Sequence, residues 1–284
     1  HQKVIEEAPS PVVDDDLRAR MGAAAVAAAQ AVGYVGAGTV EFVLDANGGD
    51  DDGTFAFLEM NTRLQVEHPV TELVTGLDLV RLQLLVAMGR PLPAEVSQPR
   101  ITGHAVEARL YAEDPTKGYL PQTGTLRTMQ IPDHVGVRVD SGVRDGSVVS
   151  HHYDAMLAKV IAWAPTRAEA LGALSAALAG ARIHGLTTNR DLLVRVLRHD
   201  EFAGRGTDTG FLDRHDVADL GAALIDRDGE GLHAIAATLA QVAGRRAAAP
   251  VQPTLPAGWR NNPSQLQSTG WLTADGRERR VGYA

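Results

Sequence analysis

The chain has 284 residues, a formal net charge of −8 and no cysteine. Its hydrophobic fraction of 44% and charged fraction of 22% are ordinary for a globular protein. The acidic balance argues against a nucleic-acid partner, and the lack of thiols excludes disulfides, thiol catalysis and thiolate metal sites. No apolar run reaches the length of a membrane span, so we expect no membrane contact and a cytoplasmic location.

The amino-terminal residues favour a strand followed by a helix. Residues 1–9 alternate polar and apolar side chains like an edge strand, and the alternation stops at Pro9. These residues alone also fit a solvated charged strand without a function. Residues 14–16 are aspartates, and they precede a helical pattern that ends at Gly33, so acidic groups lie at the favourable end.

A hairpin with a long connection is predicted next. One strand covers residues 39–44, a turn-rich acidic stretch covers residues 45–53, and the second strand begins at Phe55. An antiparallel pairing places Glu41 across from Glu59. Opposed carboxylates repel each other, and a divalent cation between them would relieve that repulsion.

Polar residues then recur at every second position. They share one face if the backbone stays extended, and they are Glu59, Asn61, Arg63, Gln65 and Glu67. A surface strand would show the same alternation. The types are more specific, because carboxylates and amides can bind a hard cation, an arginine can hold an anion, and one carboxylate can act as a base.

Residues 59–72 read EMNTRLQVEHPVTE and resemble the EMNxRxQVEHPVTE signature of biotin carboxylases, the ATP-grasp enzymes of biotin-dependent carboxylases. The opening residues resemble the HQKVxEEAP segment of that family, and residues 103–115 resemble its GHAxExRxxAEDP segment. The resemblance extends over about residues 1–212 and implies ATP- and bicarbonate-dependent carboxylation of biotin.

The resemblance also implies roles for single residues. Mg²⁺ or Mn²⁺ is expected at Glu41, Glu59 and Asn61. The ATP site is expected to include His1, Val43, Glu41 and Glu59. Bicarbonate is expected to contact Arg63, Gln65, Val66 and Lys3. The expected catalytic residues are Glu67 as general base, Arg109 as the group that stabilises the biotin enolate, Arg63 and Lys3.

Further along the chain, helices and strands are predicted in alternation. Helices are expected at 75–89, at 190–197 and at about 231–243. Another helix is expected to begin with a capping box at Thr166 and Glu169 and to end at Gly180. β-rich stretches are expected at 103–115 and from Thr123. His151 and His152 are adjacent, and on a strand they would point to opposite faces, so we expect no metal there. Glu107 and Lys159 are expected to be structural.

We therefore expect an α+β chain with four parts. They are the carboxyl-terminal part of an ATP-grasp domain at 1–122, a biotin carboxylase C-terminal domain at 123–213, a helical segment and linker at 214–252, and the start of a carboxyltransferase-bridging β domain at 253–284. The family's glycine-rich phosphate loop is expected before His1, and a biotinylated carrier domain after Ala284. We expect this segment alone to be inactive.

The expected partners are bicarbonate, a biotin carboxyl carrier domain and a carboxyltransferase β subunit, in a homo- and hetero-oligomer. Two alternatives stay open, which are a module that recruits the carboxyltransferase and another ATP-grasp ligase such as half of a carbamoyl-phosphate synthetase. Acetyl-, propionyl- and 3-methylcrotonyl-CoA are all possible acyl substrates of such an assembly. Residues 259–264 slightly favour the last.

Overall fold

The computed structural model describes residues 3–44, 55–97, 99–204, 208–251, 254–255, 259, 265–273 and 276–283. The chain forms two compact units, His1–Ala222 and Ala223–Ala284. Helices and strands are mixed along both, which confirms the α+β prediction. None of the described helices is both long enough and apolar enough to cross a lipid bilayer.

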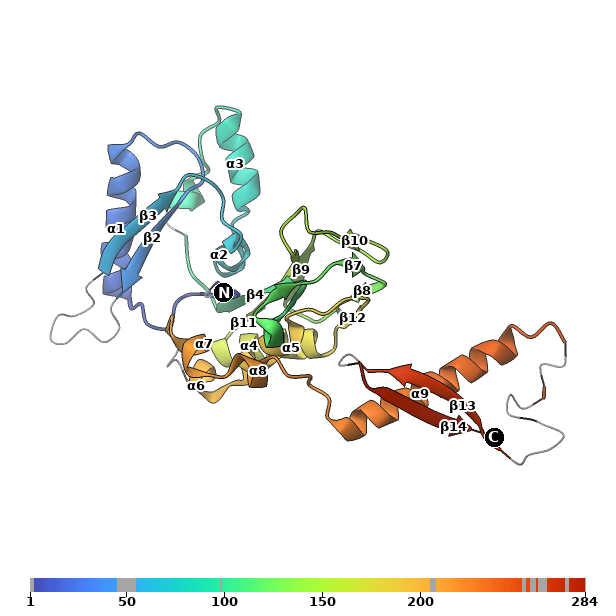
Figure 1. Ribbon diagram of the computed structural model, residues 1–284. Coiled ribbons are helices and arrows are strands. Elements are labelled where there is room, and N and C mark those ends of the chain that lie inside the picture. Colours follow the sequence, from blue (N-terminus) through green and yellow to red (C-terminus); the bar gives the residue numbers. More distant parts are fainter. Residues whose placement is uncertain are drawn as a thin grey trace. The chain divides into compact units, whose positions relative to one another are not determined.

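A four-stranded antiparallel sheet is the centre of the larger unit (Figure 1). Its order is β1-β4-β11-β9, and its strands are β1 (Ile5–Ala8), β4 (His104–Tyr111), β11 (Met156–Ala164) and β9 (Val137–Ser141). The edge position predicted for the first strand is confirmed. The predicted division near residue 122 falls inside this unit, since β4 pairs with β11 from the later part of the chain.

The two faces of this sheet are covered by different helices. One face packs against α4 (Arg167–Ala179) and α5 (Arg190–Arg198). The capping box predicted at the start of α4 is present, with Thr166 and Glu169 bonded reciprocally. On the other face, α2 (His68–Thr75) places Val70 and Val74 against Ala105 and Ile161. The residues that follow on this second face are charged, and they form the site described below.

The predicted hairpin is confirmed. Strands β2 (Thr39–Leu44) and β3 (Phe55–Asn61) pair in antiparallel register, with Glu41 opposite Glu59. Helix α1 (Asp15–Ala31) precedes them, and the side chain of Asp14 caps it by accepting a hydrogen bond from Leu17 N. The expected connection between the strands, residues 45–53, lies outside the described residues.

The segment after β3 differs from the prediction in two ways. The extended backbone ends at Asn61 and does not continue to Glu67, because the partner of Asn61, Thr39, is the first residue of β2 and no described strand pairs with the chain beyond it. Helix α2 then begins at His68 with Pro69 in its first turn, where proline is well tolerated. The helix predicted at 75–89 is shorter and begins later, as α3 (Leu79–Ala87). Gly76, with φ 73°, ends α2, and the side chain of Asp78 caps α3.

The rest of the larger unit consists of short elements, which confirms a β-rich stretch after Thr123. The two-stranded pairs are β5 (Glu113–Asp114) with β6 (Leu120–Pro121), β7 (Gly124–Thr125) with β10 (Val148–Val149), and β8 (Thr128–Gln130) with β12 (Arg182–His184). The short helices are η1 (Ala94–Ser97), η2 (Pro115–Lys117), α6 (Asp200–Ala203), α7 (Phe211–Arg214) and α8 (Val217–Leu220).

The smaller unit combines one helix and one hairpin. Helix α9 (Arg227–Ala247) is longer than predicted at both ends, and it packs on strand β14 (Glu278–Tyr283), which pairs with β13 (Gln267–Leu272). The indole of Trp271 donates a hydrogen bond of 2.8 Å to Thr238 Oγ1 on the helix. This bond and the ion pairs of Arg277 and Arg279 with Glu230 join the hairpin to α9.

Candidate active site

A cluster of polar side chains lies on the β2–β3 hairpin. The side-chain amide of Asn61 donates to Glu41 Oε1 at 3.0 Å and to Glu59 Oε1 at 2.9 Å. Lys3 adds an ion pair of 3.1 Å to Glu41 Oε2, and Gln65 Nε2 donates to Glu41 Oε1 at 3.3 Å. An ammonium group and two amides therefore offset the repulsion between the opposed carboxylates.

The 62–67 segment connects this cluster to the central sheet. Arg63 Nη1 donates to Gln65 Oε1 at 3.0 Å, so the exposed arginine lies beside Gln65. The carbonyl of Val66 accepts a hydrogen bond of 2.8 Å from Lys159 Nζ on β11. The backbone of the 62–67 segment is irregular, so its polar residues point in different directions. Lys159 of the sheet holds the segment in place.

Arg109 on β4 forms the second part of the site. Its Nη2 lies 2.8 Å from Glu67 Oε2 and 3.3 Å from Glu6 Oε1. Its Nε lies 3.9 Å from Glu107 Oε1, which belongs to the same face of the same strand. Three carboxyl groups therefore surround one guanidinium, which is almost fully buried.

The pairing of the strands explains why these groups meet. Glu6 is the direct partner of Glu107 in the β1–β4 pairing, and Lys159 is the direct partner of Arg109 in the β4–β11 pairing. Directly paired residues project from the same face of a sheet, as do residues two apart on one strand. This face continues on β9 with Asp140, the partner of Lys159.

Two of these carboxyl groups bind protons more strongly than usual. Burial, and then the nearby charge of Glu67, raises the pKa of Glu6 to about 7. Burial raises the pKa of Glu107 to about 7 as well, although the charges of Lys159 and Arg109 act in the opposite direction. Desolvation is the main cause in both cases, because it disfavours the charged form.

A cavity of about 690 Å³ opens beside Arg109. Its lining combines cationic, acidic and aromatic side chains, namely Lys3, Arg109, Tyr111, Glu113, Tyr119 and Asp213. Burial raises the pKa of Glu113 and of Tyr119. The cavity has room for a small organic molecule whose polar end contacts Arg109.

The structure brings together most of the residues that the sequence singles out. Glu41, Glu59, Asn61, Gln65 and Lys3 form one group, and Glu67 with Arg109 forms another. Val43 lies on β2 with its side chain 54% exposed, and His1 lies outside the described residues. Sequence reasoning did not assign Glu6 to the site, and the only available signal was its alternation with charged neighbours on a strand.

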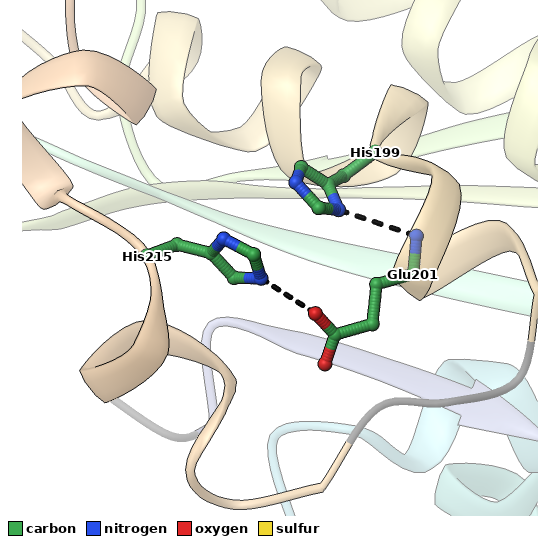
Figure 2. Close-up of side chains that lie close together, drawn as sticks. All are labelled: His199, Glu201 and His215. Carbon is green, nitrogen blue, oxygen red and sulfur yellow. Dashed lines mark hydrogen bonds and ion pairs between the residues drawn. The ribbon is translucent and has the colours of Figure 1, made fainter.

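His199, Glu201 and His215 form a separate cluster with the ligand types of a metal site (Figure 2). However, His199 Nδ1 accepts the backbone N–H of Glu201 at 3.2 Å. A metal-bound imidazole normally donates its other ring N–H, so this bond conflicts with binding through Nε2. Glu201 is already paired with Arg214 at 2.5 Å and with His215 at 2.6 Å. We interpret the cluster as a helix cap and ion-pair network.

The adjacent histidines His151 and His152 do not lie on a strand, which corrects the prediction. They occupy a turn, and their ring centroids are 4.0 Å apart. A turn does not send neighbouring side chains to opposite faces as a strand does. Among the described residues, no third histidine, aspartate or glutamate joins them in a metal-binding group.

Comparisons with known proteins match two regions of the larger unit. Residues 107–214 match the family described as the biotin carboxylase C-terminal domain, and residues 1–95 match the ATP-binding domain of the carbamoyl-phosphate synthase L chain. The chain is 49% identical over 215 residues to the mitochondrial methylcrotonoyl-CoA carboxylase subunit alpha of Glycine max, which covers 76% of this chain and 29% of the relative. It is 48% identical over 215 residues to biotin carboxylase 2 of Bacillus subtilis, a match that covers 76% of this chain and 47% of that relative.

The solved structures give the same result. The biotin carboxylase domain of the 2-oxoglutarate carboxylase of Hydrogenobacter thermophilus, in complex with MgADP, ADP and bicarbonate, has a TM-score of 0.73 and 35% identity, over 78% of this chain and 48% of that chain. The present chain thus spans less than half the length of these relatives. Since two family matches and the fold agree over residues 1–214, this part of the chain is a biotin carboxylase segment, with an ATP-binding region at 1–95 and a biotin carboxylase C-terminal domain at 107–214.

Proposed function

We propose that the chain supplies the bicarbonate and biotin side of an ATP-dependent biotin carboxylase. In the proposed reaction, bicarbonate attacks the γ-phosphate of ATP and displaces ADP to give carboxyphosphate, which breaks down to CO₂ and phosphate. A ureido nitrogen of biotin then loses its proton and bonds to the carbon of CO₂. The observation that carries the proposal is the contact between Glu67 and Arg109, a carboxylate and a guanidinium held 2.8 Å apart beside a cavity.

Glu67 is the proposed general base for bicarbonate. Its carboxylate accepts the bicarbonate proton at the side chain, which leaves the substrate a better nucleophile toward phosphorus. Arg63 and Gln65 are bonded to each other at 3.0 Å and offer a planar fork and an amide for the bicarbonate oxygens. Lys3 and the backbone of Val66 complete this proposed bicarbonate site.

Arg109 is the proposed stabiliser of negative charge on the biotin oxygen. Its guanidinium lines the cavity and is almost fully buried, so its charge is little screened by water. The contact with Glu67 fixes its orientation before substrate arrives. A preoriented cation lowers the cost of forming the enolate, because the protein does not have to reorganise during the reaction.

The residues of the hairpin fit a magnesium ion. Glu41 and Glu59 lie opposite each other, so carboxylate oxygens are available, and oxygen ligands are those that Mg²⁺ or Mn²⁺ prefers. Asn61 Nδ2 bonds both carboxylates, and rotation of this side-chain amide would turn its oxygen toward a bound ion. A bound ion would neutralise charge on the ATP phosphates. Val43 is exposed on the same strand and is proposed to contact the adenine ring, and His1 is proposed to contact the nucleotide.

The first experiment is ATP cleavage by the complete subunit that carries these residues, with bicarbonate and with or without free biotin. Glu67→Gln is expected to lower the biotin-stimulated rate by about 10²- to 10⁴-fold, as expected for loss of a general base. Glu95→Gln, on the exposed turn η1, is the matched control and should retain activity. Cleavage that ignores biotin would favour another ATP-grasp ligase, and full activity in Glu67→Gln would refute the role of that residue.

The acyl-CoA substrate and the partners are a finer part of the proposal. Several relatives are named as methylcrotonoyl-CoA carboxylase alpha subunits, which supports 3-methylcrotonyl-CoA as the acceptor of the complete assembly. A carboxyltransferase β subunit and a biotin carboxyl carrier domain are the proposed partners, and the smaller unit is the candidate for subunit recruitment. Copurification of a β subunit that is lost when residues after 250 are deleted would support recruitment. Because the relatives include mitochondrial and bacterial proteins, the cytoplasmic location stays a prediction.

A further inference from the structure

Glu6 lies at the point where the two parts of the proposed active site meet. We infer that Glu6 is a positioning residue, which shares the guanidinium of Arg109 with Glu67 and, together with Glu107, sets how tightly Arg109 is held away from substrate. This inference rests on the proposed function, since it concerns the group that is proposed to stabilise the biotin oxygen.

One nitrogen atom of Arg109 is shared between two carboxylates. Arg109 Nη2 lies 3.3 Å from Glu6 Oε1 and 2.8 Å from Glu67 Oε2. A shift of the guanidinium toward one carboxylate lengthens its contact with the other. The charge on Glu6 therefore determines whether the guanidinium of Arg109 lies closer to Glu6 on the sheet or to Glu67 in the site.

A pair of carboxyl groups, Glu6 and Glu107, lies beside Arg109. Glu6 and Glu107 are direct partners in the strand pairing, so their side chains share one face. Glu107 is fully buried, and neither of its carboxyl oxygens has a hydrogen-bond partner in the described part of the chain. Two neighbouring carboxyl groups in such a place cannot both ionise without a large cost. The raised pKa values of both groups agree with this geometry.

The other charged groups around the pair are already engaged. Lys159 is bonded to Val66 O and lies 3.5 Å from Asp140, and Lys3 is paired with Glu41. From helix α2, the groups on this side are Glu72, which is paired with Arg138, and His68, whose Nδ1 contacts Gln65 O. The remaining groups that face the pair are Arg109 and Glu67. The proton on the Glu6–Glu107 pair is thus a charge that can change near neutral pH.

Ionisation of Glu6 as the pH rises changes how Arg109 is held. At low pH Glu6 is neutral, and Arg109 is held mainly by Glu67 and is available to the biotin oxygen. As the pH rises through neutrality, Glu6 becomes charged and competes for the same Nη2 atom. The ability of Arg109 to stabilise negative charge on biotin is therefore expected to fall as Glu6 ionises.

The test compares Glu6→Gln with wild type in the complete subunit, because glutamine imitates the neutral carboxyl group. The ratio of kcat/KM for free biotin, variant over wild type, is expected to be close to one at about pH 6 and to rise about tenfold at about pH 8.5, the effect of one hydrogen bond. Glu7→Gln is the control. Glu7 is the next residue of β1, faces the other side of the sheet and pairs with Arg167, so this variant reports general damage to the strand.

Infrared spectroscopy supplies a readout that does not depend on turnover. The absorption of protonated carboxyl groups that disappears between about pH 6 and about pH 8.5 should be smaller in Glu6→Gln and unchanged in Glu7→Gln. An unchanged infrared titration in Glu6→Gln, or a kcat/KM ratio that does not vary with pH, would overturn the inference. If wild type shows no biotin dependence while the infrared titration depends on Glu6, the proposed function fails and the carboxyl pair is nevertheless established.

Discussion

Lys159→Met is the substitution that tests how the site is attached to the sheet. The lysine side chain is 11% exposed, and its Nζ donates a hydrogen bond of 2.8 Å to Val66 O. A hydrogen bond to a charged group contributes about 1.5–3 kcal/mol. Methionine keeps the packing of the aliphatic stem but leaves the carbonyl without this donor. We expect the free energy of unfolding of the larger unit to fall by about 2 kcal/mol.

The matched control is Lys117→Met. Lys117 is 67% exposed and forms an ion pair of 2.9 Å with Asp114, three residues earlier. Exposed ion pairs contribute about 1 kcal/mol or less, so this variant should be close to wild type. Urea unfolding measures both variants by tryptophan fluorescence, to which Trp163 on β11 contributes.

Lys159→Met should also affect catalysis by the complete subunit. Release of the Val66 carbonyl would let the 62–67 segment move, and Arg63 and Gln65 lie on this segment. We expect the KM for bicarbonate to rise about tenfold, while that of Lys117→Met stays at the wild-type value. Equal stability and equal KM in the two variants would show that Lys159 does not hold the segment, and this reasoning would be refuted.

Two further predictions concern stability. Because burial raises the pKa of Glu107 from 4.5 to about 7, the folded chain binds more protons than the unfolded chain between these values, and the free energy of unfolding falls as pH rises through this window. Glu107→Gln should reduce that decline when urea unfolding is measured at about pH 5 and about pH 8, and an unchanged slope would contradict the assignment. In the smaller unit, Thr238→Val removes the acceptor of the Trp271 indole N–H and should cost about 1–2 kcal/mol, measured by the same unfolding assay, whereas a difference of about 0.3 kcal/mol or less would count against this bond.

The local elements of the fold could be predicted because neighbouring residues determine them. The capping box at Thr166 and Glu169 depends on residues three positions apart, and both hydrogen bonds are present. The pairing of Glu41 with Glu59 follows from two strands that are close in sequence. The EMNTRLQVEHPVTE run indicates the family for the same reason, since its residues are consecutive.

The arrangement of the site depends on contacts between distant parts of the chain, which alternation along the sequence does not reveal. The alternation from Glu59 to Glu67 predicts one extended strand, but the strand ends at Asn61, where its pairing with β2 ends. A helix follows from His68, because burial of Val70 and Val74 on the sheet favours a helix there. Glu6 and Arg109 are 103 positions apart, and Lys159 and Val66 are 93 positions apart. The sequence by itself therefore determined which chemical groups are present, while strand pairing in the tertiary structure decided which of them share a face and become buried together.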